Sequence, residues 1–112
     1  MKVIITKRFP FKPYVALTCN PWVFIRQDYI DEYSLTDQYI RTLNHEKIHI
    51  EQQKELGLFR FFTLYLWWFL KWLPLGWGQA YRNIPFEAEA YSWAHKLDYL
   101  ADRTKNAWKL YK

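Results

Sequence analysis

Two histidines lie four positions apart in the stretch LNHEKIHIEQ (residues 43–52), and a glutamate directly follows the first of them. If this stretch is helical, His45 and His49 lie one turn and ~40° apart on the helix surface. Both imidazoles can then reach one point in space. Because neutral imidazole is a common ligand of Zn²⁺, the spacing predicts a candidate metal site.

The glutamate of this stretch, Glu46, falls where an apolar side chain is expected. A helix over about residues 35–56 has an apolar stripe that must face the core: Leu35, Tyr39, Leu43 and Ile50. Glu46 lies in that stripe, and a buried carboxylate costs free energy unless a polar or charged group meets it. A zinc ion with a bound water meets this need, because the carboxylate can take a proton from the water and later give it to a leaving amine. The HExxH pattern, a metallopeptidase signature, therefore predicts Glu46 as general base and one Zn²⁺ per chain as cofactor.

A third ligand is expected in the stretch NIPFEAEAY (residues 83–91). Glu87 and Glu89 lie about 200° apart on a helix, so only one of them can face the metal. Glu87 borders small alanines that let another helix approach closely, whereas Glu89 borders the bulky Trp93 and Leu100. The helical positions favour Glu87 as ligand and leave Glu89 as the alternative.

HEKIHIEQ, followed about forty positions later by FEAEAY, resembles the gluzincin branch of zinc metallopeptidases, especially its smallest members. The resemblance covers residues 35 to about 100 and implies a zincin-like fold and hydrolysis of a peptide or protein substrate. In such families a downstream E-x-x-A-D or E-x-x-S-D pattern supplies the third ligand. Glu87 and Ala90 match it here, but Tyr91 replaces the Asp that usually orients a zinc-binding histidine.

Further polar side chains are expected around such a site. The candidates to orient a histidine in place of the missing Asp are Gln52 and Asp98. A peptidase also needs a donor for the oxyanion that forms when water attacks a carbonyl. The candidates for this role are Tyr81, Arg82, Tyr91 and His95. By analogy with zincins, one of the strand segments YVALT and WVFIR is expected to bind an extended peptide along its edge.

The pattern of elements predicts a single α+β domain over residues 1–112, with a small N-terminal antiparallel sheet packed on three helices. Residues 1–33 are expected to form strands and a hairpin, since KVIIT, YVALT and WVFIR are β-branched and aromatic. The HExxH helix is expected within residues 34–57, because Gly57 is a natural stop. A Trp-rich apolar helix should follow over residues 58–73, and a helix that carries the third ligand over residues 85–111.

Composition narrows the setting of the protein. Its 16 Lys and Arg outnumber its 11 Asp and Glu, but these cations are scattered and no nucleic-acid-binding motif is present, so a nucleic-acid partner is not expected. A lone cysteine, Cys19, excludes an internal disulfide and suits a reducing compartment. The opening MKVIITKRFPFKP lacks the apolar stretch of a signal peptide, so a cytoplasmic location is expected.

The Trp-rich segment supports a second interpretation. Its uninterrupted apolar run, FFTLYLWWFL, is shorter than the roughly 20 residues that a membrane span requires. The segment is therefore expected to lie in the core, in a contact between copies of the chain or peripherally on a membrane surface. The alternative to a peptidase is a non-catalytic interaction module that keeps the zincin scaffold and uses residues 58–77 for contact.

Overall fold

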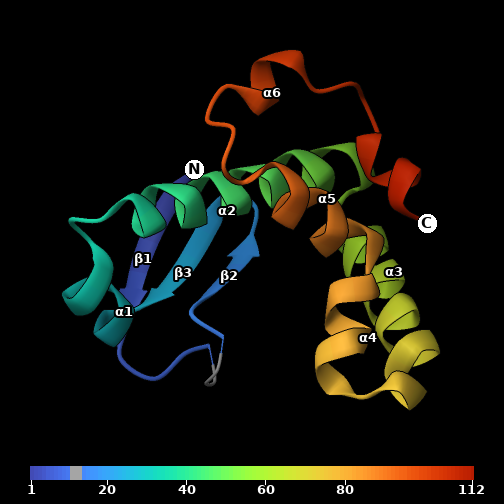
Figure 1. Cartoon of the computed structure of the whole chain (residues 1–112), viewed down its shortest axis with the longest axis horizontal. Coiled ribbons are helices and arrows are strands. Elements are labelled where there is room, and N and C mark those ends of the chain that lie inside the picture. The colour runs from blue at the N-terminus through green and yellow to red at the C-terminus, as the bar shows by residue number, and fades with distance from the viewer. Residues whose placement is uncertain (11–13) are drawn as a thin grey trace.

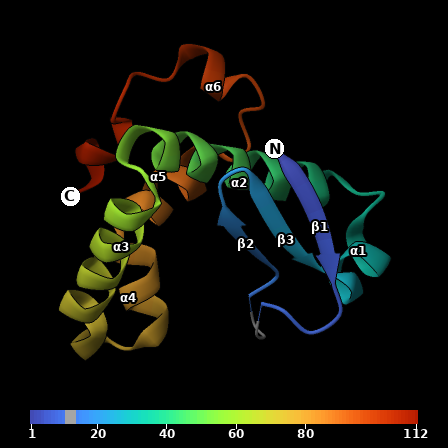
Figure 2. The same ribbon diagram turned by 180° about the vertical axis from the view of Figure 1, so that it is seen from behind.

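The computed structural model describes residues 1–10 and 14–112, and these form an α+β arrangement (Figure 1). The long helix α2 (Asp37–Leu56) runs across the molecule. The sheet lies against one half of it, and the hairpin of α3 (Leu58–Trp72) and α4 (Trp77–Asn83) extends from its other end (Figures 1 and 2). α2 is therefore the element that the two halves of the molecule share.

The sheet has three strands in the order β1-β3-β2: β1 (Lys2–Thr6), β2 (Ala16–Cys19) and β3 (Trp22–Arg26). The turn in CNPW joins β2 and β3 into the expected antiparallel hairpin. The prediction of a wholly antiparallel sheet is wrong, because β1 pairs with β3 in parallel. The chain reverses between β1 and β2 and again between β2 and β3, so β1 runs in the same direction as β3 and fills its second edge.

A short helix, α1 (Gln27–Tyr33), replaces the end of the predicted strand region. Asp28 lies in its first turn, where its carboxylate accepts the backbone N–H of Tyr29 at 2.8 Å. A carboxylate at this position stabilises a helix start, because it meets unpaired N–H groups and the positive end of the helix dipole. Tyr29 then packs with Val23 and Ile25 of the sheet.

The HExxH helix has nearly the bounds that the sequence predicts. Thr36 caps α2, with its hydroxyl accepting the N–H of Tyr39 at 3.4 Å, and the helix ends at Gly57, whose φ of 80° favours glycine. Leu35 is fully exposed ahead of the helix, so its predicted place in the core stripe is wrong. Ile50 of that stripe is buried as expected.

Three apolar clusters hold the elements together, and α2 contributes to each. Between the sheet and α2 lie Val23, Ile25, Tyr29 and Ile50. Under α3 lie Phe61, Ile84, Phe86 and Trp108, with Leu56 of α2 packed against them. A third cluster consists of Ile48, Ala90 and Tyr99. Among the described residues, no helix is long and apolar enough to cross a bilayer.

The predicted helix over residues 85–111 is broken into three pieces: α5 (Pro85–Trp93), α6 (Tyr99–Asp102) and the 3₁₀-helix η2 (Ala107–Tyr111). A contact from α2 accounts for the first break. The side-chain amide of Asn44 donates to the carbonyls of Trp93, Ala94 and Lys96 at 3.3, 2.9 and 3.0 Å. These bonds satisfy carbonyls at the end of α5 that continued helix would otherwise pair.

Two further short helices follow the Trp-rich helix in the chain: η1 (Leu73–Leu75) and α4. The bounds of α3 lie within one residue of the predicted 58–73, but α4 was not predicted. Gly76, with a φ of 101°, separates η1 from α4 and lets the chain turn back along α3. This reversal places Tyr81 and α5 beside the HExxH helix.

Candidate metal centre

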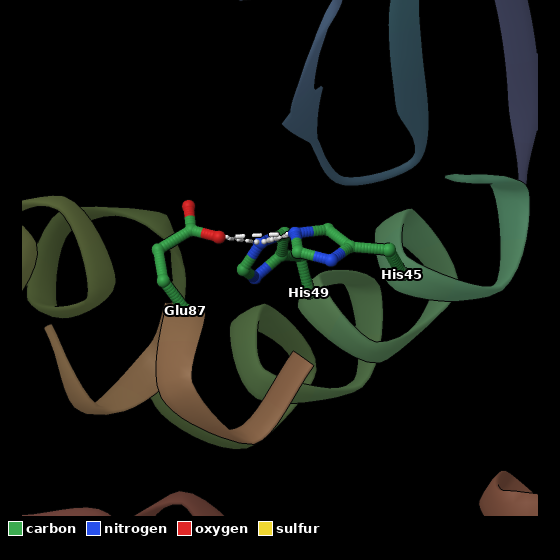
Figure 3. Close-up of side chains that lie close together, drawn as sticks. All are labelled: His45, His49 and Glu87. Atoms are coloured by element: carbon green, nitrogen blue, oxygen red, sulfur yellow. Dashed lines mark hydrogen bonds and ion pairs between the residues drawn. The ribbon is translucent and has the colours of Figure 1, made fainter. Parts of the chain in front are cut away.

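The side chains of His45, His49 and Glu87 meet in the interior of the molecule, between α2 and α5 (Figure 3). The Nε2 atoms of the two histidines lie 3.1 Å apart. Glu87 Oε1 lies 3.0 Å from Nε2 of His45 and 3.1 Å from Nε2 of His49. All three residues are buried, with exposed fractions of 8%, 5% and 4%. The structure thus brings together the two histidines of HEKIH and the glutamate that the sequence favours.

Gln52 fixes the orientation and the tautomer of His49. Its Nε2 donates to Phe86 O at 3.0 Å and to Glu89 Oε1 at 2.9 Å, so its amide oxygen faces His49. That oxygen lies 2.8 Å from His49 Nδ1 and can only accept, so Nδ1 carries a hydrogen. In neutral His49 the lone pair is then on Nε2, the atom that faces the cluster. Gln52 has the orienting contact that the sequence suggests for Gln52 or Asp98.

Two imidazole Nε2 atoms and a carboxylate oxygen this close together need a hydrogen or a cation among them, because their lone pairs otherwise repel one another. Burial lowers the pKa of His49, but the adjacent Glu87 carboxylate outweighs burial and raises it to about 9. Burial likewise raises the pKa of Glu87, but the charge of His49 outweighs it and lowers this pKa well below its usual range. A proton satisfies the cluster in the metal-free protein. Two imidazole nitrogens and a carboxylate oxygen are also a donor set that fits Zn²⁺.

The second oxygen of Glu87 is held by a hydroxyl from α3. Tyr65 donates to Glu87 Oε2 at 2.8 Å. Burial and the charge of Glu87 both raise the pKa of Tyr65, so the phenol stays protonated at neutral pH and continues to donate. Oε1 is consequently the oxygen that Glu87 directs at the histidines.

Glu46 lies beside this cluster without being part of it. It is 6% exposed, and its Oε2 accepts a hydrogen bond from the hydroxyl of Thr18 on β2. Glu46, His49 and Glu87 all line one cavity. The hydrogen bond from Thr18 occupies one carboxylate oxygen, and no hydrogen bond from residues 1–10 or 14–112 occupies the other. This arrangement is what a general base requires.

The alternative prediction of Glu89 as the third metal ligand is wrong, because Glu89 lies on the side of α5 away from the two histidines. It is fully buried, and it accepts hydrogen bonds from Tyr99 OH at 2.7 Å and from Arg103 Nε and Nη2 at 2.5 and 3.1 Å. Arg103 also bonds both carboxylate oxygens of Glu55, at 2.9 and 3.0 Å. The two glutamates of FEAEAY thus have separate roles, and Glu89 holds Gln52 in place.

The candidate oxyanion donors gather on one side of the cluster. Four of them line a cavity together with His45 and Glu46: Tyr81, Arg82, Tyr91 and His95. Asp98 lines neither described cavity and precedes α6 at the surface, so its predicted orienting role is wrong. The ring of Tyr91 packs 4.6 Å from that of His45. Tyr91 therefore contacts His45 through its ring.

Tyr81 is the best placed of these donors. It lines the cavities on both sides of the cluster. Burial, followed by the charge of Glu87, raises the pKa of Tyr81, which keeps its hydroxyl protonated. Tyr91 OH donates to Tyr81 OH at 3.4 Å, so the hydrogen of Tyr81 itself is left for another acceptor. A carbonyl oxygen in the cleft is such an acceptor.

The edge of β2 borders the same cavity. Arg26 N donates to Val15 O at 3.0 Å, so alternate residues of β2 pair with β3 and Ala16 and Thr18 direct their backbone groups outward. Gln53 of α2 already binds part of this edge, since its Nε2 donates to Thr18 O at 2.8 Å. The outward N–H and C=O of Ala16 have no hydrogen-bond partner among the described residues. This edge can therefore accept an extended backbone.

Two cavities of different chemistry meet at Glu46. One has a volume of about 470 Å³ and is walled mostly by apolar residues of β2 and α3, among them Leu17, Phe61, Phe62, Leu66 and Phe69. The other, of about 540 Å³, is more polar and includes Gln38, Arg41, Arg82 and His95. Ala16, Glu46 and Tyr81 line both. Tyr14 and Trp77, which are joined by a hydrogen bond, also line both, so the two cavities adjoin at these residues and form a cleft in two parts beside the histidine–glutamate cluster.

Three polar contributors to the site were not predicted: Thr18, Gln53 and Tyr65. Gln53 lies seven residues after Glu46, so the helical period puts both on one face, and this was an available signal. Thr18 and Tyr65 belong to a strand and a helix that read as apolar. Only the packing of those elements against α2 brings their hydroxyls to the two carboxylates.

Comparisons of this chain with protein-family models, with curated proteins and with solved structures gave no significant match.

Proposed function

We propose that this protein is a zinc-dependent peptidase with a zincin-like site. His45, His49 and Glu87 would bind the metal, and Glu46 would act as the general base. The observation that carries the proposal is the convergence of three buried ligand atoms beside a second carboxylate, that of Glu46, which Thr18 holds separately. A purely structural metal site has no need of that extra buried acid, whose burial costs free energy.

The chemistry requires a nucleophile, a base and a donor. A bound Zn²⁺ supplies Lewis-acid charge, which lowers the pKa of a water molecule to about 7. Glu46 accepts a proton from the attacking water through the oxygen that Thr18 does not hold. Tyr81 donates to the carbonyl oxygen as negative charge builds there. Glu46 then returns the proton to the amine as the C–N bond breaks.

The cleft favours an extended peptide as substrate. Its backbone would pair with Ala16 on the open edge of β2, which lies next to Glu46. An adjacent bulky apolar side chain would fill the cavity walled by Phe61, Phe62 and Phe69. Such a cavity gains most from aromatic or long aliphatic side chains, because apolar burial scales with buried area.

The test combines metal content with hydrolysis. The wild-type protein is expected to bind close to one equivalent of Zn²⁺ and to cleave members of a quenched fluorescent peptide mixture. Glu46→Gln should keep both zinc and fold but lose activity by about 10²–10⁴-fold, because it removes the base without removing a ligand. Glu51→Gln, at a partly exposed position on the same helix whose carboxylate pairs with Lys54, is the matched control and should retain activity. A wild-type protein that binds no zinc, or a Glu46→Gln variant as active as wild type, overturns the proposal.

The role of Tyr81 has its own test. Tyr81→Phe should lower kcat by about 10²–10³-fold and leave KM nearly unchanged, because the lost hydrogen bond forms mainly in the transition state. Tyr33→Phe, a tyrosine on α1 that lines neither cavity, serves as the control. A change in KM alone would instead assign Tyr81 to substrate binding.

A second candidate is a non-catalytic interaction module on the same scaffold. The large exposed apolar surface of α3 favours it. For such a module, Glu46→Gln would leave binding of a partner intact and the wild-type protein would hydrolyse nothing.

A further inference from the structure

The Trp-rich helix α3 is almost entirely apolar yet mostly uncovered. Of its fifteen residues only Phe61 is buried. Phe59, Trp67 and Leu70 are 84%, 60% and 52% exposed. Monomeric proteins rarely expose apolar side chains in such a continuous group unless the surface contacts a partner or a membrane.

The exposed side chains form one stripe along the helix. At ~100° per residue, positions 59, 62, 66, 70 and 73 fall within one narrow arc, and Trp67 lies beside it. We call this stripe with Trp67 the α3 face. The helix itself extends from α2 beside α4, at the end of the molecule away from β1 (Figures 1 and 2). Phe62 and Leu66 also line the apolar cavity beside Glu46, so the α3 face borders that cavity and continues from it onto the exposed surface of the helix.

Only positive charges accompany this surface. Residues 57–84 contain Arg60, Lys71 and Arg82 and no Asp or Glu. On the helical wheel, Arg60 and Lys71 lie next to each other, just beyond Trp67 at one border of the face. Neither has an ion-pair partner within residues 1–10 and 14–112. The Lys71 ammonium instead lies 4.7 Å from the ring centre of Trp68 and 5.6 Å from that of Trp72.

We propose that the α3 face is a docking surface for an anionic lipid bilayer, on which the helix lies parallel to the membrane plane. Apolar side chains would enter the acyl boundary, and Trp67 would lie at the depth that indoles prefer. Arg60 and Lys71 lie at one border of the apolar stripe, and their charged ends would reach the phosphate level, Lys71 by leaving its contact with Trp68. This geometry is that of an interfacial helix, and α3 at fifteen residues is too short to span.

Charge distinguishes this occupant from a second copy of the chain. A symmetric dimer in which two copies of α3 pack antiparallel through the α3 face would bring Arg60 and Lys71 towards the cations of the partner copy. With no acid in residues 57–84, that interface offers no compensating charge. Anionic headgroups provide the opposite charge together with an apolar layer behind it. The bilayer therefore satisfies both features of the face at once.

Vesicle co-sedimentation tests the proposal and requires neither zinc nor hydrolysis. The full chain is mixed with phosphatidylcholine vesicles that contain or lack about one-third phosphatidylglycerol. We expect binding to the anionic vesicles, weak binding to the neutral ones and loss of binding in about 0.5 M NaCl. The variant Phe59→Ser/Trp67→Ser/Leu70→Ser should bind about tenfold more weakly or less, because it removes the inserting side chains.

Matched controls separate the α3 face from general effects. Leu35→Ser/Leu97→Ser removes two leucines that are 100% and 62% exposed elsewhere and should leave vesicle binding unchanged. Arg60→Glu/Lys71→Glu should abolish binding to anionic vesicles, whereas Lys47→Glu/Lys105→Glu, with the same change in net charge, should reduce it only slightly. Far-ultraviolet circular dichroism verifies that each variant is folded.

Three outcomes overturn the proposal. The first is that the protein does not sediment with anionic vesicles. If it is instead a dimer in solution that the triple variant converts to a monomer, the α3 face is assigned to a second copy of the chain. The second is equal binding to neutral and anionic vesicles, which removes the role of charge. The third is equal loss of binding in the Leu35→Ser/Leu97→Ser control, which removes the role of the α3 face.

Discussion

α2 and α3 follow each other in the chain, separated only by Gly57, yet the more polar helix, α2, is the more buried of the two, and the apolar helix, α3, is the more exposed. α2 has twenty residues, eight of them buried, and six of these eight are polar: Asn44, His45, Glu46, His49, Gln52 and Gln53. α3 is almost wholly apolar and buries only Phe61. Position in the fold, and not hydropathy, decides which of the two helices lies inside.

The difference has a physical cost in both helices. Each buried polar side chain of α2 is offset by a specific partner: Asn44 by carbonyls after α5, Gln53 by β2, and Gln52 by His49 and Glu89. The exposed apolar side chains of α3 have no such compensation among residues 1–10 and 14–112. Both helices thus depart from the pattern of polar residues outside and apolar residues inside that would be most stable. Each does so where we propose a function, a metal site in α2 and a membrane contact in α3.

The largest expected contrast is in stability. Ile48→Ala in α2 should lower the free energy of unfolding by about 2–5 kcal/mol, because Ile48 is fully buried. Leu70→Ala in α3 should change it by no more than about 0.5 kcal/mol, since that side chain is half exposed. Urea unfolding measures both. Equal losses at the two positions would mean that the α3 face is covered in solution.

The next contrast compares two neighbours within α2. Gln52→Leu should weaken zinc binding by about 10–100-fold, because it removes the hydrogen bond that orients His49. Gln53→Leu should leave zinc affinity nearly unchanged and raise KM, since Gln53 holds the edge of β2. Competition with a fluorescent zinc chelator reports the affinity. Equal effects on zinc binding would contradict the separate roles of these residues.

A smaller effect is expected from the one polar contribution of α3 to the site. Tyr65→Phe removes the hydroxyl that donates to Glu87 Oε2 and should weaken zinc binding by up to about tenfold. The aromatic ring stays, so thermal stability should change little. Tyr39→Phe on α2, whose hydroxyl has no contact with the cluster, is a suitable control. No change in zinc affinity would show that α3 supports the site through packing alone.

The smallest effect is a pH dependence of the metal-free protein. The pKa of His49 is about 9 in the fold against 6.5 in the unfolded chain, so its charge stabilises the fold fully below pH 6.5. This stabilisation is lost as the pH rises through about 9. Glu87 has a lowered pKa, so its contribution is present above 4.5 and lost in stronger acid. Thermal unfolding with a chelator should show the highest melting temperature between these limits, and the zinc-loaded protein should lack the decline above pH 6.5.

Several features follow from local sequence alone. The end of α2 is set by Gly57, which the sequence predicts as the stop of this helix. The phase of HEKIH puts two imidazoles on one side, and the small residues beside Glu87 distinguish it from Glu89. These are short-range effects of helical geometry, so they can be predicted without knowing the rest of the fold.

Other features depend on contacts between distant segments. The parallel pairing of β1 with β3 and the end of α5 at Trp93 follow from contacts made elsewhere in the chain, the latter through Asn44. The hydroxyls of Thr18 and Tyr65 reach the two carboxylates only because β2 and α3 both pack beside the C-terminal half of α2. No periodicity within a strand or helix carries this information.

The sequence by itself determined the ligand types, their spacing and the helix that presents two of them, because one helical turn fixes that geometry. The tertiary structure alone decided that Glu87 reaches both histidines, that Glu89 is drawn away by Arg103, and that the most apolar helix faces outward. The physical reason is that a side chain's partners come from whichever segments the whole core brings together, and hydropathy does not encode that choice.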